Sequence, residues 1–190
     1  QFISIFNNLV DTEQPIDNSK RDFIKKSITL GIIGISGTAT GLGFYNSRKG
    51  PSVIKHDIFL ESLPESFNNF TIAQTSDLHV GPTIKRPYVE NVLDKISIHN
   101  PDLIAVTGDL VDGSVQHLSP DLAPLKDMIA PFGTYFVTGN HEYYSGVDLW
   151  LDEIDRLGMK NLINSNELIS RAADQIAIAG ITDLNAHQIK

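Results

Sequence analysis

Three short polar runs each follow an apolar stretch of the chain and carry oxygen and imidazole ligands. They are Asp77-Leu78-His79, Gly108-Asp109-Leu110-Val111-Asp112 and Gly139-Asn140-His141-Glu142. Carboxylates and carboxamides are hard oxygen donors, and imidazole binds zinc, iron and manganese. Together the three runs therefore predict a site for two divalent metal ions.

The residue types also indicate which reaction such a site would support. A carboxylate can bridge, so Asp109 on the middle run is the candidate ligand of both ions, and Asn140 would give a neutral oxygen to the second. Two ions about 3.5–4 Å apart can generate a hydroxide and hold the attacking and leaving oxygens of a phosphoryl group. His141, next to a ligand but itself free, is then the natural proton donor to the leaving oxygen.

The apolar stretches before these runs have the composition of buried strands. Residues 70–75, 103–107 and 134–138 are short and rich in β-branched or aromatic side chains. An amphipathic helix is predicted from Pro87 to Ile96, with proline in its first turn. Its apolar residues recur at helical spacing: Val89, Val92, Leu93 and Ile96.

A second helix is predicted between the second and third strands. Ser119-Pro120-Asp121 opens it, it runs through residues 128–130, and Pro131 with Gly133 stops it. Strands joined by such crossovers run parallel, so all three polar runs emerge at one carboxyl edge of a sheet, where ligands of open α/β sheets bind. The sequence therefore predicts an α/β fold in which ligands distant in sequence converge.

The motifs DxH, GDxxD and GNHE, in this order, resemble the calcineurin-like metallophosphoesterase superfamily over residues 50–190. Residues 77–82 and 139–146 are similar to its membrane-tethered bacterial branch. The resemblance implies an α/β chain that forms the N-terminal half of a four-layer α/β/β/α sandwich. It also implies hydrolysis of phosphomonoesters or phosphodiesters at a dinuclear metal centre.

The resemblance assigns a role to each matching residue. His141 assists the leaving group, and Asp112 lies just outside the ligand set. The implied metal ligands are Asp77 and His79 on one ion, Asn140 on the other and Asp109 between them. Manganese, iron and zinc share these ligands, so the identity of the two divalent ions stays open.

The chain departs from the family pattern after the third motif. The family's remaining ligands are histidines from a later strand end and from a Gly-His-x-His turn, whereas His187 is the only histidine after His141 and no Gly-His pair occurs. The chain starts at Gln1 without methionine and stops at Lys190, just past a strand predicted over residues 175–181. We therefore expect a fragment that exposes apolar surface and needs the missing C-terminal half to complete its metal site.

Other side chains have ordinary structural interpretations. Glu142 either orients a ligand or is a solvated loop carboxylate, and it is left out of the predicted site. Residues 53–58 alternate in polarity and predict an outer strand, while Tyr143 and Tyr144 are candidates for the rim of a substrate pocket. A further helix presents one apolar face suited to core packing: Val147, Trp150, Leu151 and Ile154.

The N-terminal region predicts a membrane helix. No charged residue occurs from Ser27 to Ser47, and residues 28–47 are long enough to span a bilayer. Residues 20–26 form a basic cluster that resembles a twin-arginine export signal with lysine in the first arginine position. This cluster should stay cytoplasmic, which puts the rest of the chain on the extracytoplasmic side of the cell membrane. An uncleaved anchor is preferred to a removed signal peptide, because no small-x-small cleavage site follows.

The predicted organisation has three parts. Residues 1–19 are a membrane-proximal tail of an earlier helix and a linker, residues 20–49 are the basic cluster and anchor, and residues 50–190 are the truncated metallophosphoesterase domain. The net charge of −8 argues against nucleic-acid binding, and the absence of cysteine excludes disulfides and thiolate metal sites.

The leading hypothesis is a membrane-anchored phosphoesterase in which a hydroxide held by two metals attacks phosphorus while His141 protonates the departing oxygen. The alternative is a noncatalytic, membrane-tethered phosphate- or partner-binding relative that lacks the C-terminal ligands. A third interpretation is an exported periplasmic enzyme whose mature chain begins near residue 45. The substrate stays open, since many phosphoesters present the same reacting phosphorus.

Overall fold

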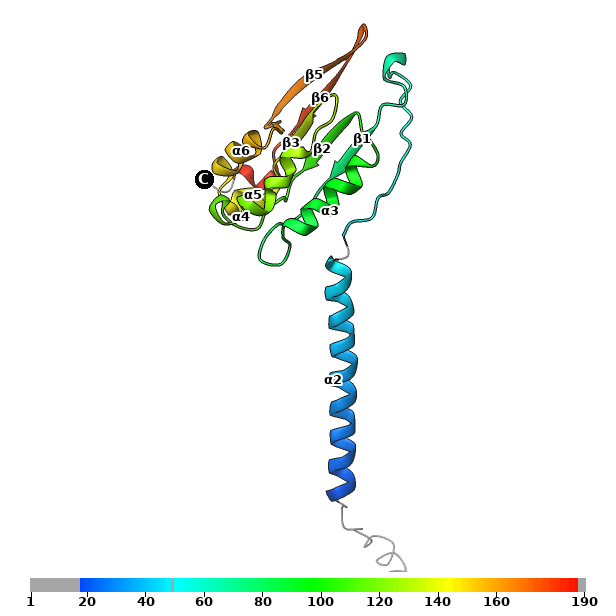
Figure 1. The fold of residues 1–190 in the computed structure, drawn as a ribbon, viewed down its shortest axis with the longest axis vertical. Coiled ribbons are helices and arrows are strands. Elements are labelled where there is room, and N and C mark those ends of the chain that lie inside the picture. Colours follow the sequence, from blue (N-terminus) through cyan, green and yellow to red (C-terminus); the bar gives the residue numbers. More distant parts are fainter. Residues whose placement is uncertain (1–17, 49, 188–190) are drawn as a thin grey trace, which may run out of the picture. The chain divides into compact units, whose positions relative to one another are not determined.

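The computed structural model describes residues 18–48 and 50–187 of the chain, which Figure 1 shows as a ribbon. They fall into two compact units, one ending at Lys49 and the other beginning at Gly50. The predicted tail of an earlier membrane helix, at residues 1–17, lies outside the described residues.

The described residues of the first unit form one long helix, α2 (Asn18–Arg48). Its stretch Asn18–Asn46 is long and apolar enough to cross a membrane, judged by length and composition. Its described side chains are all exposed within this unit, including Ile32 and Ile35. The predicted apolar N-terminal helix is therefore confirmed.

The second unit is built on a four-stranded parallel sheet in the order β1-β2-β3-β4. Its strands are β1 (Ile72–Thr75), β2 (Leu103–Thr107), β3 (Thr134–Val137) and β4 (Lys160–Asn161). The predicted α/β class and parallel sheet are confirmed, and each polar run follows one of the first three strands. Because these strands are parallel, the runs lie at one edge of the sheet.

Helices connect the strands of this sheet. The α-helices are α3 (Arg86–Ser97), α4 (Val115–Leu122), α5 (Asn140–Ser145) and α6 (Val147–Arg156). The 3₁₀ helices are η1 (Glu65–Phe67), η2 (Ala123–Asp127) and η3 (Leu184–His187). The helix predicted over 87–96 corresponds to α3, and the helix predicted around Trp150 corresponds to α6, with Trp150 and Ile154 buried.

Both predicted ends of the second crossover helix are wrong. Helix α4 ends at Leu122 and η2 at Asp127, so residues 128–130 are not helical. Helix α4 begins four residues earlier, at Val115 after Ser114, and Pro120 lies inside it. The Ser119 hydroxyl does not cap a helix but donates to Glu153 Oε1 at 2.6 Å. A serine that bonds to a distant side chain carries the same local signal as a capping serine, which explains the error in the start.

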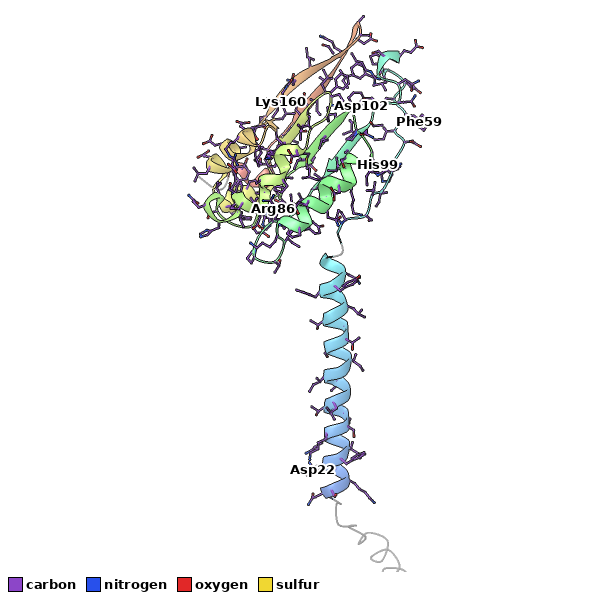
Figure 2. All side chains as sticks on the ribbon, in the orientation of Figure 1. Asp22, Phe59, Arg86, His99, Asp102 and Lys160 are labelled. Carbon is purple, nitrogen blue, oxygen red and sulfur yellow. The ribbon has the colours of Figure 1, made fainter. Side chains whose placement is uncertain are left out.

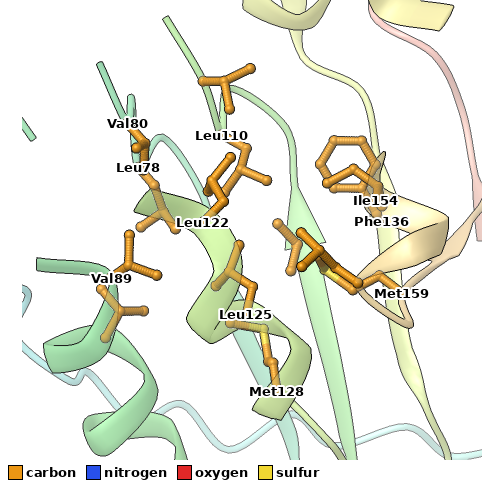
Figure 3. Packing of buried hydrophobic residues seen from close by; sticks show 14 of the residues in the cluster. Leu78, Val80, Val89, Leu110, Leu122, Leu125, Met128, Phe136, Ile154 and Met159 are labelled. Carbon is orange, nitrogen blue, oxygen red and sulfur yellow. The ribbon is translucent and has the colours of Figure 1, made fainter. Parts of the chain in front are cut away.

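Two hydrophobic clusters cover the two faces of the sheet. Ile104, Val106 and Phe136 belong to the cluster under α3, α4 and α6, part of which is drawn in Figure 3. The alternate residues Leu103 and Tyr135 belong to a second cluster on the other face. Strands buried on both faces read as continuous apolar runs, which is why the strands were visible in the sequence.

The second cluster is closed by a hairpin of two antiparallel strands, β5 (Ser165–Arg171) and β6 (Asp174–Gly180). The strand predicted over residues 175–181 is thereby confirmed within one residue. Ile169 of β5 is buried against the sheet, whereas its neighbour Leu168 is 58% exposed. The hairpin thus packs one face and leaves apolar surface on the other.

The outer strand predicted over residues 53–58 is wrong. These residues form no strand, and no backbone hydrogen bond joins them to another segment among the described residues. Ile54 and Ile58 are exposed, and Phe59 is 93% exposed (Figure 2). Alternating polarity is not sufficient for a strand, because the backbone also needs a ladder partner.

Candidate metal centre

The turn after β1 is joined to the turn after β2 through the main chain. The N–H of Asp77 donates to the carbonyl of Gly108 at 3.1 Å, and the N–H of His79 donates to that of Asp109 at 3.0 Å. Val80 then forms a parallel bridge with Val111. The first two polar runs therefore lie side by side.

Three of the predicted ligands have left-handed backbone conformations. The φ angles are 56° at Asp77, 46° at His79 and 52° at Asp109. Residues other than glycine rarely adopt this conformation, and such strain concentrates at functional sites.

Imidazole and carboxylate groups from all three turns meet at this edge of the sheet. Ligand atoms of His79, Asp109 and His141 lie within 4.8 Å of one another, a grouping found among the described residues. The two imidazole rings are edge to face, with centroids 4.5 Å apart. Asp109 Oδ1 accepts the backbone N–H of His141 at 2.9 Å, which holds the carboxylate against the third turn.

The Asn140 side chain faces the carboxylate of Asp109. One carboxamide atom lies 3.1 and 3.2 Å from the two Asp109 oxygens. If this atom is nitrogen, it donates to the carboxylate; if it is oxygen, two acceptors face each other, an arrangement that a cation between them would stabilise. The hard oxygen donors and imidazoles assembled here fit a divalent metal ion.

Asp77 lies at the margin of the cluster. Its Oδ1 is 3.7 Å from His79 Nε2, and its side chain is 63% exposed. The hydroxyl of Ser76 donates to its other oxygen. Asp77 is thus next to the histidine with which it was predicted to share a metal, but it is not part of the three-residue grouping.

A single carboxylate oxygen, Oδ1 of Asp112, contacts both histidines. It is 3.2 Å from His79 Nδ1 and 2.5 Å from His141 Nδ1. A neutral imidazole that donates from Nδ1 keeps its lone pair on Nε2. Asp112 can therefore orient both rings so that each presents Nε2 to a metal or a substrate.

Glu142 is not a solvated loop carboxylate, because only 1% of its surface is exposed. Its carboxylate accepts the backbone N–H groups of Asp109, Leu110 and Gly139 at 3.0, 2.7 and 2.7 Å. Burial raises the pKa of this carboxyl group, although the backbone donors act in the opposite direction. Sequence reasoning omitted Glu142, yet a glutamate at the third position of a helix can accept the N–H of the N-cap residue, as Glu142 does here from Gly139.

Two glycines allow the second and third turns to approach closely. A Cβ atom on Gly139 would lie 2.2 Å from Asp109 Oδ1 and 2.6 Å from Asp109 N. Gly108 has a φ of +79°, and a Cβ there would lie 2.4 Å from Gly139 N. The glycines of the second and third motifs, Gly108 and Gly139, are therefore required by contact between the two turns.

The two tyrosines after the third run differ in their surroundings. The hydroxyl of Tyr143 is 3.1 Å from Thr138 Oγ1 and is part of the packed turn. Tyr144 is 62% exposed, and its ring centroid is 5.7 Å from that of His141. Of the two tyrosines, Tyr144 is thus the one that is exposed beside the candidate site.

Comparison with known proteins agrees with this geometry. The family model described as Calcineurin-like phosphoesterase matches residues 70–187, which is more than half of the chain. The chain belongs to this family. The match includes all three polar runs of this calcineurin-like phosphoesterase and the sheet that positions them.

Several relatives are similar to this calcineurin-like phosphoesterase. The Danio rerio protein named transmembrane protein with metallophosphoesterase domain is 36% identical over 152 residues, 78% of this chain and 35% of its own length. An uncharacterized metallophosphoesterase of Helicobacter pylori is 30% identical over 146 residues, 77% of this chain and 38% of its own. The chain thus spans little more than a third of the length of these curated relatives.

One solved structure is also similar, the phosphopantetheinyl hydrolase PptH from Mycobacterium tuberculosis. It is 18% identical, with a TM-score of 0.41, over 58% of this chain and 41% of that one.

Proposed function

We propose that this protein is a membrane-anchored, metal-dependent phosphoesterase that hydrolyses a phosphomonoester or a phosphodiester. The observation that carries the proposal is the convergence of His79, Asp109 and His141, whose ligand atoms lie within 4.8 Å. Membership of the calcineurin-like phosphoesterase family supports the reaction class.

The proposed ligands hold two divalent ions, which are manganese, iron or zinc. Asp77 and His79 bind one ion, Asn140 binds the other, and Asp109 bridges them. When bound, such ions lower the pKa of a coordinated water and neutralise charge on the phosphoryl group. The position of Asp109 suits the bridging role, because its carboxylate lies within 4.8 Å of ligand atoms of His79 and His141, and the Asn140 carboxamide faces its oxygens at 3.1 and 3.2 Å.

His141 protonates the leaving oxygen in this proposal. The Nδ1 atom of His141 is 2.5 Å from Asp112 Oδ1, and this carboxylate stabilises the protonated ring and fixes its orientation. The Nε2 atom then carries the transferable proton. Asp112 acts through the histidine and needs no contact with substrate.

The membrane part of the proposal concerns α2 and the basic residues at its start. Lys20, Arg21, Lys25 and Lys26 precede the apolar stretch 28–47, so this end stays cytoplasmic and the phosphoesterase domain faces outward. Protease treatment of intact cells should cleave the domain and spare the N-terminus. Mature protein that begins near residue 45 would instead favour the exported soluble enzyme.

Two substitutions in the full-length protein test the reaction. Asp109→Asn should lower metal content and abolish hydrolysis of a chromogenic phosphodiester. His141→Ala should retain the metals and lower turnover about 10²–10⁴-fold, as expected for loss of a general acid. Metal analysis and turnover are measured on both variants.

Exposed residues of the same types supply matched controls. Asp152→Asn and His99→Ala should change neither metal content nor turnover, since both side chains are exposed outside the cluster. Equal metal loss in Asp109→Asn and His141→Ala would contradict the proton-donor role. Metal binding without turnover on any phosphoester would favour the noncatalytic relative.

A further inference from the structure

Glu142 connects two ligand turns that come from different strands. Its Oε2 accepts from the N–H of Asp109 at 3.0 Å and from that of Gly139 at 2.7 Å, while Oε1 accepts from Leu110 at 2.7 Å. The side chain is 1% exposed, so no bulk water competes for these donors. One buried carboxylate therefore satisfies backbone groups on both sides of the junction between the turns.

The contact to Asp109 falls on a strained residue. Asp109 has a φ of 52°, in the left-handed region that residues other than glycine avoid. Its N–H donates to Glu142, and its Oδ1 accepts from the N–H of His141. These bonds hold the backbone and the carboxylate of Asp109 together in a conformation that residues other than glycine rarely adopt.

The same contacts determine where Asn140 stands relative to Asp109. Asn140 lies between Gly139 and His141, and the N–H of each neighbour is bonded to Glu142 or to Asp109. The Asn140 carboxamide then lies 3.1 and 3.2 Å from the Asp109 oxygens. The spacing of these two side chains thus depends on the junction that Glu142 holds.

A glutamate that only capped α5 would contact Gly139 alone. Glu142 also reaches Asp109 and Leu110 on the other turn, which a cap does not require. We propose that Glu142 is a positioning residue that sets the distance between Asp109 and Asn140 and, through it, the metal affinity of the site. This inference rests on the proposed metal-dependent function.

Glu153 provides a buried glutamate for comparison. It is 7% exposed, and its carboxylate accepts hydrogen bonds from the side chains of Ser119 and Arg156. Neither of these residues belongs to the turns that carry the proposed ligands. Substitution of Glu153 should therefore affect stability without affecting metal affinity.

The test measures Mn²⁺ affinity by titration of the full-length protein, at a temperature where each metal-free variant is folded by circular dichroism. Glu142→Gln places an NH₂ group where backbone N–H groups now meet an oxygen, and Glu142→Asp keeps the charge but is one methylene shorter. Both should weaken Mn²⁺ binding about 10- to 100-fold, the range for groups that orient ligands. Glu153→Gln should lower the melting temperature and leave Mn²⁺ affinity unchanged.

Each outcome decides a different point. Wild-type Mn²⁺ affinity in Glu142→Asp would overturn the inference, because charge alone would then be sufficient. Wild-type affinity in folded Glu142→Gln would overturn it as well. If Glu142→Gln does not fold, Glu142→Asp carries the test. Wild-type protein that binds none of Mn²⁺, Fe²⁺ and Zn²⁺ would overturn the proposed function itself, and this role with it.

Discussion

The turns after β2 and β3 are built differently from the turn after β1. The turns after β2 and β3 meet through the buried carboxylate of Glu142 and through the close contact of Gly139 with Asp109. The turn after β1 is held by main-chain bonds from Asp77 and His79, and the Asp77 side chain is 63% exposed. One half of the candidate site is thus clamped by a buried carboxylate, whereas the other half is held by main-chain bonds and by the partly exposed side chain of Asp112.

This difference teaches how the site would respond to metal. Ligands on clamped turns keep their geometry without an ion, because buried hydrogen bonds hold the supporting backbone. We expect Asn140 and Asp109 to be positioned in advance. For Asp77, whose side chain is 63% exposed, we expect a bound ion to contribute more to its order.

The largest effect is expected for Gly139→Ala, which breaks the clamped half. The new Cβ would lie 2.6 Å from the backbone nitrogen of Asp109, which cannot move aside as a side chain could. We expect a loss of about 3 kcal/mol or more in the free energy of unfolding, together with loss of metal binding. Urea denaturation and metal analysis measure both.

A second glycine controls for this experiment. Gly158 has a φ of +89° but no atom near its added Cβ. Gly158→Ala should therefore cost only about 1 kcal/mol of conformational strain and leave metal binding intact. Similar losses in the two variants would show that contact between the turns is unimportant.

Asp112→Asn tests the link between the two halves. It removes the charge that faces both His79 and His141, whose Nδ1 atoms lie 3.2 and 2.5 Å from Oδ1. Phosphodiesterase turnover or metal affinity should fall about 10- to 100-fold, with little change in stability, since the side chain is 35% exposed. Unchanged turnover and affinity would mean that each ring is oriented by its own turn.

Asp77→Gly and Asp109→Gly sharpen the comparison in metal-free protein. Each substitution places glycine, which tolerates a positive φ, at a residue with a left-handed backbone conformation. Asp77→Gly should therefore stabilise the fold by about 1 kcal/mol. Asp109→Gly also loses the bond from the N–H of His141 and should gain little or nothing. Urea denaturation in a chelator measures the difference, and equal shifts would contradict the clamp.

The smallest effect concerns Glu153, which lies outside both turns. The pKa of the Glu153 carboxyl group is lower than the ordinary value of 4.5, mainly because this group accepts hydrogen bonds from the Arg156 guanidinium. A lowered carboxyl pKa contributes stability above pH 4.5, and this contribution is lost as the pH falls through the folded-state value. Glu153→Gln should therefore cost about 1 kcal/mol at pH 7 and progressively less below pH 4.5. A pH-independent difference would contradict this account.

Much of the fold was predictable because its signals are local. Ile104 and Val106 alternate with Leu103 along a strand buried on both faces, and such a run is visible in the sequence. The α4 start was not predictable, because the Ser119 hydroxyl bonds to Glu153 on another helix. Residues 53–58 have strand-like alternation, but no partner backbone among the described residues completes a ladder.

The sequence by itself determined which side chains are able to bind metal and that three strand ends carry them. Only the tertiary structure decided that Asp112 is shared by His79 and His141, and that Glu142 is buried between two turns. These contacts join residues 33 and 29 positions apart for Asp112, and 33 and 32 positions apart for Glu142 with Asp109 and Leu110. Local periodicity reports which face of an element is buried, but it does not report which distant donor meets which carboxylate.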